Sequence, residues 1–244
     1  MGLKGYLNKT VARGVSRKLA VRKSPGPIVS FTFDDFPRSA MQTAGRMMQE
    51  RGYSATYYAA LGLAGQSSSV GPLFLMDDLY ELVSAGHELA CHTFHHLSAH
   101  QAQPLELQED CSENRRAALK LMNGYYLENF SFPFGDVTLS AKVALGRIYR
   151  SCRTVSHGLN GETIDMSYLL ANPIGPDHQQ IEALIQENAR AGSWLIFYTH
   201  DVVEKPSPFG CTPTQFEQVL NCVVRSGAEI LPVRNALARF EHQG

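Results

Sequence analysis

The chain has 244 residues, of which 44% are apolar and 18% are charged, and its formal net charge is −1. This composition is typical of a globular protein with a substantial core, and it does not favour nucleic acid as a partner. No segment reaches the run of about 18 apolar residues that a membrane-spanning helix needs. The five cysteines are scattered without CxxC spacing, and the N-terminus lacks the apolar core of a secretory signal. We therefore expect reduced thiols and a cytoplasmic location.

Residues 1–26 are predicted to form a basic segment in front of a catalytic domain over residues 27–244. Apolar residues recur every four positions at Leu3, Leu7, Val11, Val15 and Leu19, and residues 1–33 hold seven lysines and arginines and no acid. The pattern predicts a basic amphipathic helix. Such a helix could lie on an anionic membrane, cover one end of the domain, or act as an organelle transit peptide.

From Pro27 onward, short apolar runs alternate with segments that read as helices. The expected strands are Ile28–Phe33, Thr56–Ala60, Glu88–Ala90, Phe130–Phe132, Ser151–Val155, Ala171–Ile174, Trp194–Thr199 and Ile230–Val233. Glycines at positions 52, 86, 192 and 227 are expected to end helices, and Thr212-Pro213-Thr214-Gln215 is expected to begin one. This alternation indicates an α/β fold with parallel strands and favours a barrel, whose chemistry would lie where strands end.

Three polar clusters follow expected strands. They are Asp34-Asp35, the histidines His92, His95, His96 and His100, and His200. One carboxylate and two imidazoles would hold a zinc-like ion with an open position, and a second carboxylate and a further histidine would move protons. The spacing of His92 and His96 is the best for a shared ion, although it does not exclude His95 or His100.

With these clusters in place, the chain resembles the polysaccharide deacetylase (NodB-homology) family over about residues 27–233. The family motif T-F-D-D matches Thr32-Phe33-Asp34-Asp35, H-[ST]-x-x-H matches His92-Thr93-Phe94-His95-His96, and a strand ending in histidine matches Leu195–His200. The resemblance implies a distorted (β/α)7–8 barrel. It implies that Asp34 is the general base, that Asp35, His92 and His96 bind the metal, and that His200 is the general acid. The motif R-x-P-[FY]-G is matched only in its second half, where the backbone N–H of Phe134 would stabilise the oxyanion.

Two departures from the family pattern concern the groups around the base and the acid. Ser131 stands where many members have the arginine that pairs with the catalytic aspartate, and the Asp-rich motif that orients the acid has no clear counterpart. Arg150, Arg153 and Asp165 are the candidates to replace the lost groups. We expect a divergent branch of the family.

The expected activity is hydrolysis of an N-acetyl, or similar small N-acyl, group on an amino sugar. Zinc is the expected metal, and cobalt or nickel could take its place. The expected substrate is a lipid-linked or activated glycan precursor in surface polysaccharide assembly, such as O-antigen or exopolysaccharide. The alternatives are hydrolysis of another C–N bond, as in a cyclic amide, and a catalytically inactive sugar-binding module.

Overall fold

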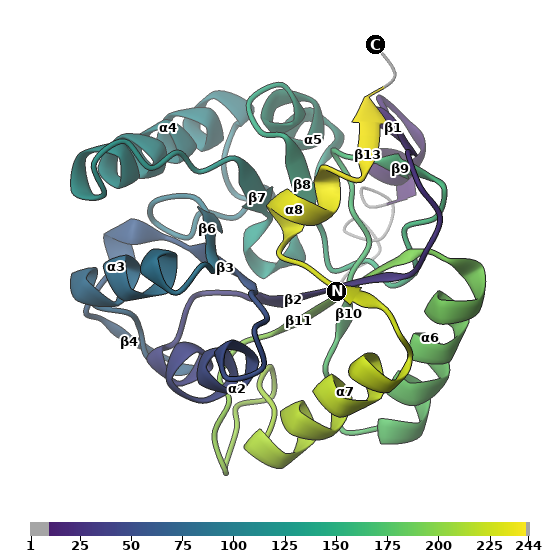
Figure 1. The fold of residues 1–244 in the computed structure, drawn as a ribbon. Helices are drawn as coiled ribbons and strands as arrows, with labels where there is room; N and C mark the ends of the chain where they lie inside the picture. Colours follow the sequence, from purple (N-terminus) through teal and green to yellow (C-terminus); the bar gives the residue numbers. More distant parts are fainter. Residues whose placement is uncertain (1–9, 243–244) are drawn as a thin grey trace.

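Strands β2 (Ile28–Phe33) and β11 (Trp194–Thr199) lie side by side in an eight-stranded parallel sheet. The computed structural model describes residues 10–242. Along the sheet the order is β10 (Asn172–Pro173), β11, β2, β3 (Thr56–Ala59), β6 (Glu88–Cys91), β7 (Asn129–Ser131) and β8 (Ser151–Arg153). The short strand β12 (Glu229–Ile230) pairs with the first residues of β2. The sheet is curled, which confirms the barrel-type α/β fold (Figure 1).

Helices surround the curled sheet (Figure 1). They are α2 (Arg46–Gln49), which continues the π-helix Ala40–Gly45, α3 (Met76–Ser84), α4 (Pro104–Leu121), α5 (Leu139–Gly146), α6 (His178–Ala191), α7 (Pro213–Arg225) and α8 (Val233–Leu237). Alternate side chains of β2 face these helices, so Phe31 and Phe33 both pack against Phe216 of α7. The other face of β2 is polar, and Ser30 accepts a hydrogen bond from the Trp194 ring inside the sheet.

All eight expected strands are present with ends that differ by up to three residues, and Val233, which was expected in the last strand, begins α8 instead. The expected glycines have positive φ angles, and Thr212 and Gln215 bond each other's backbone N–H at the start of α7, as predicted. Five strands were not predicted: β1 (Leu19–Arg22), β4 (Ser67–Ser68), β5 (Gly71–Pro72), β9 (Thr163–Asp165) and β13 (Phe240–His242). They pair antiparallel over two to four residues, too short for a periodic pattern.

The N-terminal segment differs from the expected helix. Residues 10–14 are helical, but Leu19–Arg22 forms β1, which pairs with β9 on one side and β13 on the other. The backbone of β1 pairs along both of its edges, and this pairing overrides the helical preference that the four-residue apolar repeat gives to Leu19. The part of the prediction over residues 1–9 lies outside the described residues. Among helices within residues 10–242, none is long and apolar enough to cross a membrane.

Candidate active site

The C-terminal ends of β2, β6 and β11 bring the three predicted polar clusters to one cavity of about 430 Å³. The titratable and polar lining consists of Asp34, Asp35, Ser68, Ser69, His92, His96, Tyr198 and His200. The apolar lining consists of Leu63, Val70, Leu73, Phe134, Val155 and Phe209. Residues more than 160 positions apart in the sequence therefore meet at one edge of the sheet.

Asp35 and two imidazoles form the metal-type cluster of this cavity. Asp35 Oδ1 lies 3.0 Å from His96 Nε2 and 3.5 Å from His92 Nε2, yet this buried oxygen has no hydrogen-bond partner among the described residues. Donor atoms that are close together without bonding one another fit three ligands directed at a common ion, and this set suits zinc, cobalt or nickel. Burial would raise the pKa of Asp35, but the adjacent His92 and His96 rings hold it well below its usual range.

Ser131 fixes the tautomer of His92. The carbonyl oxygen of Ser131 lies 2.9 Å from His92 Nδ1, and its hydroxyl lies 2.7 Å from the same atom. Because a carbonyl can only accept, Nδ1 carries the proton and Nε2 keeps a free lone pair toward Asp35. Ser131, which stands where the family arginine was expected, thus orients the ring of His92.

The two other histidines of the cluster have different partners. His95 Nδ1 lies 2.6 Å from Asp110, and His100 Nδ1 lies 3.1 Å from Asp136. Both therefore contact carboxylates that do not line the cavity. The sequence spacing left His95 and His100 open as alternatives to His96, but the fold directs them to these other partners. His96 is the second imidazole beside Asp35.

Left-handed turns present these side chains. Asp35, Thr93, His96 and Phe134 have φ angles of 60°, 60°, 59° and 59°, a conformation that costs a non-glycine residue about 1–3 kcal/mol. These residues lie in the loops that follow β2, β6 and β7. Their turns point successive side chains in directions that the regular alternation of a strand would not give. Asp34 and Asp35 consequently have different neighbours although they are adjacent in the sequence.

Asp34 pairs with Arg153, which comes from β8. The guanidinium donates a hydrogen bond to Asp34 Oδ1, and both side chains are almost completely buried. The guanidinium also lies over the rings of Tyr58 and Tyr198, 5.0 and 5.3 Å from their centroids. Burial would raise the pKa of Asp34, but the charge and hydrogen bond of Arg153 together with the neighbouring His92 and His200 lower it. A carboxylate held ionised in this way can accept a proton.

The other two candidates for the missing arginine partner lie elsewhere. Arg150 pairs with Glu128 at 2.7 Å on the surface, and Asp165 pairs with the buried Lys142 at 2.6 Å. Of the three candidates, Arg153 is therefore the one that pairs with Asp34.

His200 lies on the far side of Asp35. Its Nε2 is 4.0 Å from Asp35 Oδ2, and its buried Nδ1 has no hydrogen-bond partner within residues 10–242. The carboxylate that would orient this ring in the family is thus not supplied by the described residues. The neighbouring Asp201 instead bonds the backbone and the hydroxyl of Ser207, which shapes the loop that carries Phe209.

Phe134 forms part of the cavity wall, as Phe209 does. Its side chain is 65% exposed and meets the His96 ring edge-on at 4.4 Å between centroids. The next residue, Gly135, has a φ of 64°, and a Cβ there would lie 2.2 Å from Val155. Only glycine fits at this position, and the turn brings the Phe134 backbone to the rim of the cavity.

Tyr58, Tyr198 and the apolar walls of the cavity were not predicted from the sequence. Tyr198 could have been found, because it is the second-to-last residue of the strand that leads to His200 and alternates with Phe197 and Thr199. The β4–β5 hairpin, which supplies Ser68, Ser69 and Val70, has no such signal.

A sequence model described as polysaccharide deacetylase matches residues 21–147, and the chain therefore belongs to the polysaccharide deacetylase family. Its members are hydrolases that remove acetyl groups from sugars, and this chain is such an enzyme by family. Among curated proteins, no sequence matches it.

Solved structures with the same fold are distant in sequence. The CE4 domain of a multidomain xylanase from the hindgut metagenome of Trinervitermes trinervoides is 16% identical, with a TM-score of 0.60 over 88% of this chain and 91% of that one. The chitin deacetylase of Colletotrichum lindemuthianum is 13% identical, with a TM-score of 0.59 over 88% of each chain. A family 4 acetyl xylan esterase from Clostridium thermocellum, in complex with a cobalt ion, is 15% identical, with a TM-score of 0.56 over 86% of this chain and 90% of that one.

Proposed function

We propose that this protein is a metal-dependent N-deacetylase that hydrolyses the acetyl group, or a similar small acyl group, of an amino sugar. The observation that carries the proposal is the separation of the two aspartates. Asp35 lies with two imidazole nitrogens, whereas Asp34 is paired with Arg153. A hydrolase of this type needs one carboxylate to hold a metal and another to accept a proton.

Asp35, His92 and His96 would hold the metal, with zinc as the expected ion and cobalt or nickel as substitutes. A cobalt ion is present in the acetyl xylan esterase of Clostridium thermocellum. When bound, such an ion acts as a Lewis acid that polarises the acyl carbonyl and makes water more acidic.

The protein's own groups would complete the reaction. Asp34 accepts a proton from the attacking water, and Arg153 keeps it ionised for this purpose. The backbone N–H of Phe134 donates to the oxyanion of the tetrahedral intermediate. His200 then donates a proton to the departing sugar nitrogen, which leaves as a free amine together with acetate.

The proposed substrate is a glycan precursor for surface polysaccharide, such as O-antigen or exopolysaccharide. The cavity volume of about 430 Å³ is within the range of about 300–1,000 Å³ of small-molecule sites, and the β4–β5 hairpin and Phe209 form part of its walls. These features suit a short sugar unit. All five cysteines are buried and free, which supports a reducing, cytoplasmic setting. Contact with an anionic membrane stays a prediction, because the described part of the N-terminal segment packs on the barrel.

The test is an acetate-release assay over N-acetylated amino sugars, O-acetylated sugars and small cyclic amides, with and without a chelator. We expect acetate from N-acetylated sugars and loss of activity in chelator, with recovery on adding zinc or cobalt. Ring opening of cyclic amides without acetate release would favour the other C–N hydrolysis. A protein that binds sugars but hydrolyses none of these compounds would be a binding module.

A further inference from the structure

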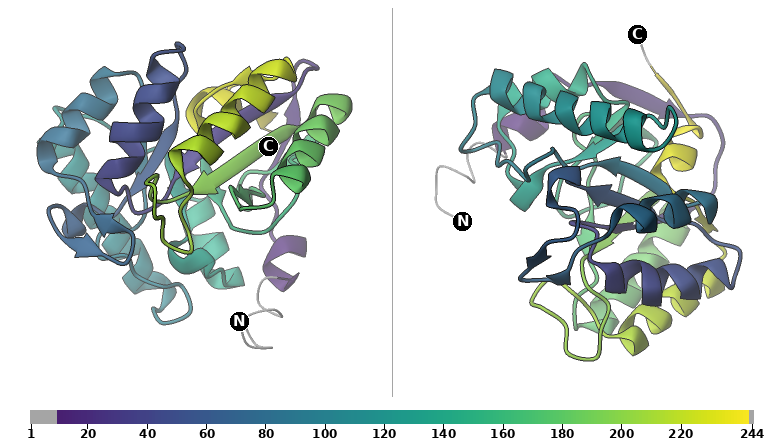
Figure 2. Two further views of the ribbon diagram at one scale, coloured as in Figure 1. Left: turned by 90° about the horizontal axis from the view of Figure 1, so that it is seen from below. Right: turned by 90° about the vertical axis from the view of Figure 1, so that its left-hand side faces the viewer.

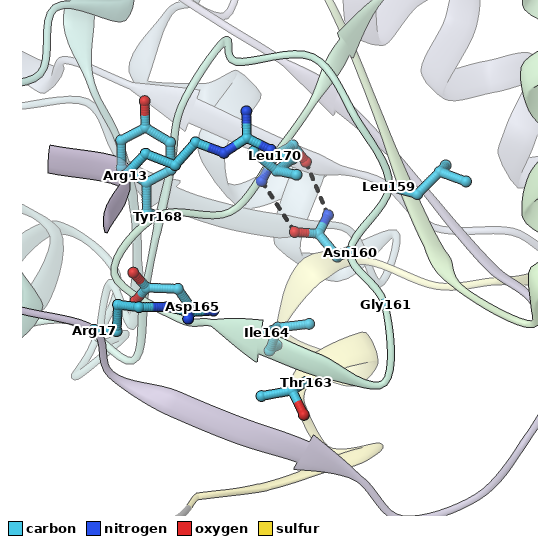
Figure 3. Close-up of a pocket in the computed structure, with 10 residues that line it drawn as sticks. All are labelled: Arg13, Arg17, Leu159, Asn160, Gly161, Thr163, Ile164, Asp165, Tyr168 and Leu170. Atoms are coloured by element: carbon cyan, nitrogen blue, oxygen red, sulfur yellow. Dashed lines mark hydrogen bonds between the residues drawn. The ribbon is translucent and has the colours of Figure 1, made fainter. Parts of the chain in front are cut away.

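A second cleft of about 270 Å³ lies between the N-terminal segment and the loop over residues 159–170 (Figure 3). Arg13 and Arg17 line it from the N-terminal segment, opposite the loop that carries Asn160 and Thr163. Both guanidinium groups are exposed, and neither forms an ion pair with any residue in the described range 10–242. Two arginines without a carboxylate partner make this cleft electropositive.

The acid in the cleft is already neutralised. Asp165 accepts hydrogen bonds from the backbone N–H groups of Lys18 and Ser167 and from the ammonium of Lys142. Both carboxylate oxygens of Asp165 therefore accept hydrogen bonds, and the ammonium of Lys142 balances its charge. The positive charge of the two arginines remains available to an external anion.

A buried lysine holds the arginine-bearing segment in place. Lys142 is completely buried, and its ammonium also donates to the carbonyls of Ala12 and Val15, which flank Arg13. The ammonium of Lys18, directly after Arg17, donates to the carbonyls of Gly146 and Tyr149 at the end of α5. Because the backbone on both sides is anchored, the two arginines are presented at a fixed place rather than on a free tail.

The far wall of the cleft is also fixed. The side chain of Asn160 donates to the Leu170 carbonyl and accepts from the Leu170 N–H, the two bonds drawn in Figure 3. Asn160 is thus occupied in shaping the loop. The charged groups that line the cleft and form no ion pair among residues 10–242 are the two guanidinium groups, which match the geometry of phosphate oxygens.

One segment of the chain borders both the cleft and the catalytic cavity. Val155 lines the cavity, and the next residue, Ser156, bonds the hydroxyl of Tyr168, which lines the cleft. In the left view of Figure 2 the helix over residues 10–14 and the loop 201–211 both lie along the lower side of the molecule. A substrate whose sugar enters the cavity could therefore extend to the arginines.

We propose that this cleft binds a phosphate group carried by the acylated sugar substrate, through Arg13 and Arg17. The proposal rests on the proposed function and specifies its substrate as an amino sugar joined to phosphate or diphosphate. The reaction that supplies this substrate must then be one that transfers a sugar phosphate or attaches a sugar to a phosphorylated carrier.

The first test is binding of glucose 1-phosphate, which has no acyl group to hydrolyse, measured by calorimetry with glucose as reference. We expect the wild type to bind the phosphate and Arg13→Gln/Arg17→Gln to bind it roughly tenfold more weakly. Arg46→Gln/Arg190→Gln is the matched control, since it removes the same charge from exposed or partly exposed positions outside the cleft. Arg13→Lys/Arg17→Lys should restore part of the affinity.

The second test compares N-acetylglucosamine 1-phosphate with its neutral methyl glycoside as substrates. The ratio of their kcat/KM values should fall about tenfold in Arg13→Gln/Arg17→Gln and stay constant in the control. Equal phosphate binding by the wild type and the cleft variant would overturn the proposal, whatever the enzyme hydrolyses. A second result would also overturn the proposal: the protein binds phosphatidylglycerol vesicles through both arginines but does not bind the sugar phosphate. The partner of the cleft would then be a membrane.

Discussion

Arg153 on β8 hydrogen-bonds Asp34 at the end of β2, 119 positions away in the sequence, and both side chains are buried. The strand that carries the family arginine, β7, offers Ser131 instead, which contacts His92. The cation that pairs with Asp34 thus comes from β8, the neighbour of β7 in the sheet.

Replacing Arg153 should impair the base. Arg153→Gln leaves Asp34 buried without its cation, so burial raises the pKa of Asp34 and the acid limb of the kcat/KM profile moves to higher pH. We expect kcat/KM to fall roughly 10²-fold at neutral pH. The unpaired carboxylate should also cost up to about 3–5 kcal/mol of unfolding free energy. Arg150→Gln, which breaks only a surface pair, is the control and should change neither quantity. An unshifted acid limb in Arg153→Gln would refute the pairing role.

His200 should act as an acid without a fixed internal partner. Its Nδ1 is buried and lacks a hydrogen bond to any described residue, so the ring depends on packing against Phe209 for its orientation. We expect His200→Gln to lower kcat roughly 10²–10⁴-fold and to alter the basic limb of the pH profile, with metal content unchanged. Phe209→Ala should lower kcat less, since it loosens the ring but keeps the proton donor. A His200→Gln enzyme with wild-type kcat would remove His200 from the mechanism.

The site residues that could be predicted are those that belong to short sequence motifs. Asp34-Asp35, His92, His96 and His200 follow strands with strong apolar patterns, so their position at the strand ends could be read directly. The choice of Arg153 over Arg150 could not, although the start of β8 at Ser151 was predicted, because the contact of Arg153 with Asp34 joins residues 119 positions apart and has no local signal. The small sheet β13-β1-β9 joins segments more than 140 positions apart, and no local signal encodes such contacts.

Truncation separates the two parts of the N-terminal segment. Removing residues 1–23 deletes β1 from between β9 and β13 and leaves Lys142 without two of its acceptors and Asp165 without the backbone of Lys18. We expect a large fall in the unfolding temperature or an insoluble protein, because a buried charge network loses its partners. Removing residues 1–9 deletes none of these contacts and is the matched control. Equal thermal stability of the two truncations would show that the segment is not part of the fold.

His87 should make the protein less stable in mild acid. Burial, with a contribution from Arg234, lowers the pKa of His87 to about 4, and its Nδ1 accepts a hydrogen bond from the Ala55 N–H. In the unfolded chain its pKa is about 6.5, so between pH 6.5 and 4 only the unfolded state binds the proton. The unfolding free energy therefore falls as the pH falls through this window, by up to about 3 kcal/mol.

The check on His87 is urea unfolding of the wild type and His87→Asn at pH values from 7 to 4.5. Asparagine can accept the same hydrogen bond but does not titrate. The difference in unfolding free energy between the two proteins should shift in favour of the variant as the pH falls. Parallel curves over the whole range would contradict the lowered pKa.

The central claim is that the adjacent aspartates have different roles, and metal stoichiometry measured beside kcat for Asp34→Asn and Asp35→Asn tests it directly. Asp34→Asn removes the proton acceptor but none of the three ligands, so kcat should fall roughly 10²–10⁴-fold with about one zinc per chain retained. Asp35→Asn removes a charged ligand, so metal content should fall, and excess zinc should restore part of the activity. An Asp34→Asn protein without metal, beside an Asp35→Asn protein that keeps both metal and activity, would contradict the assignment.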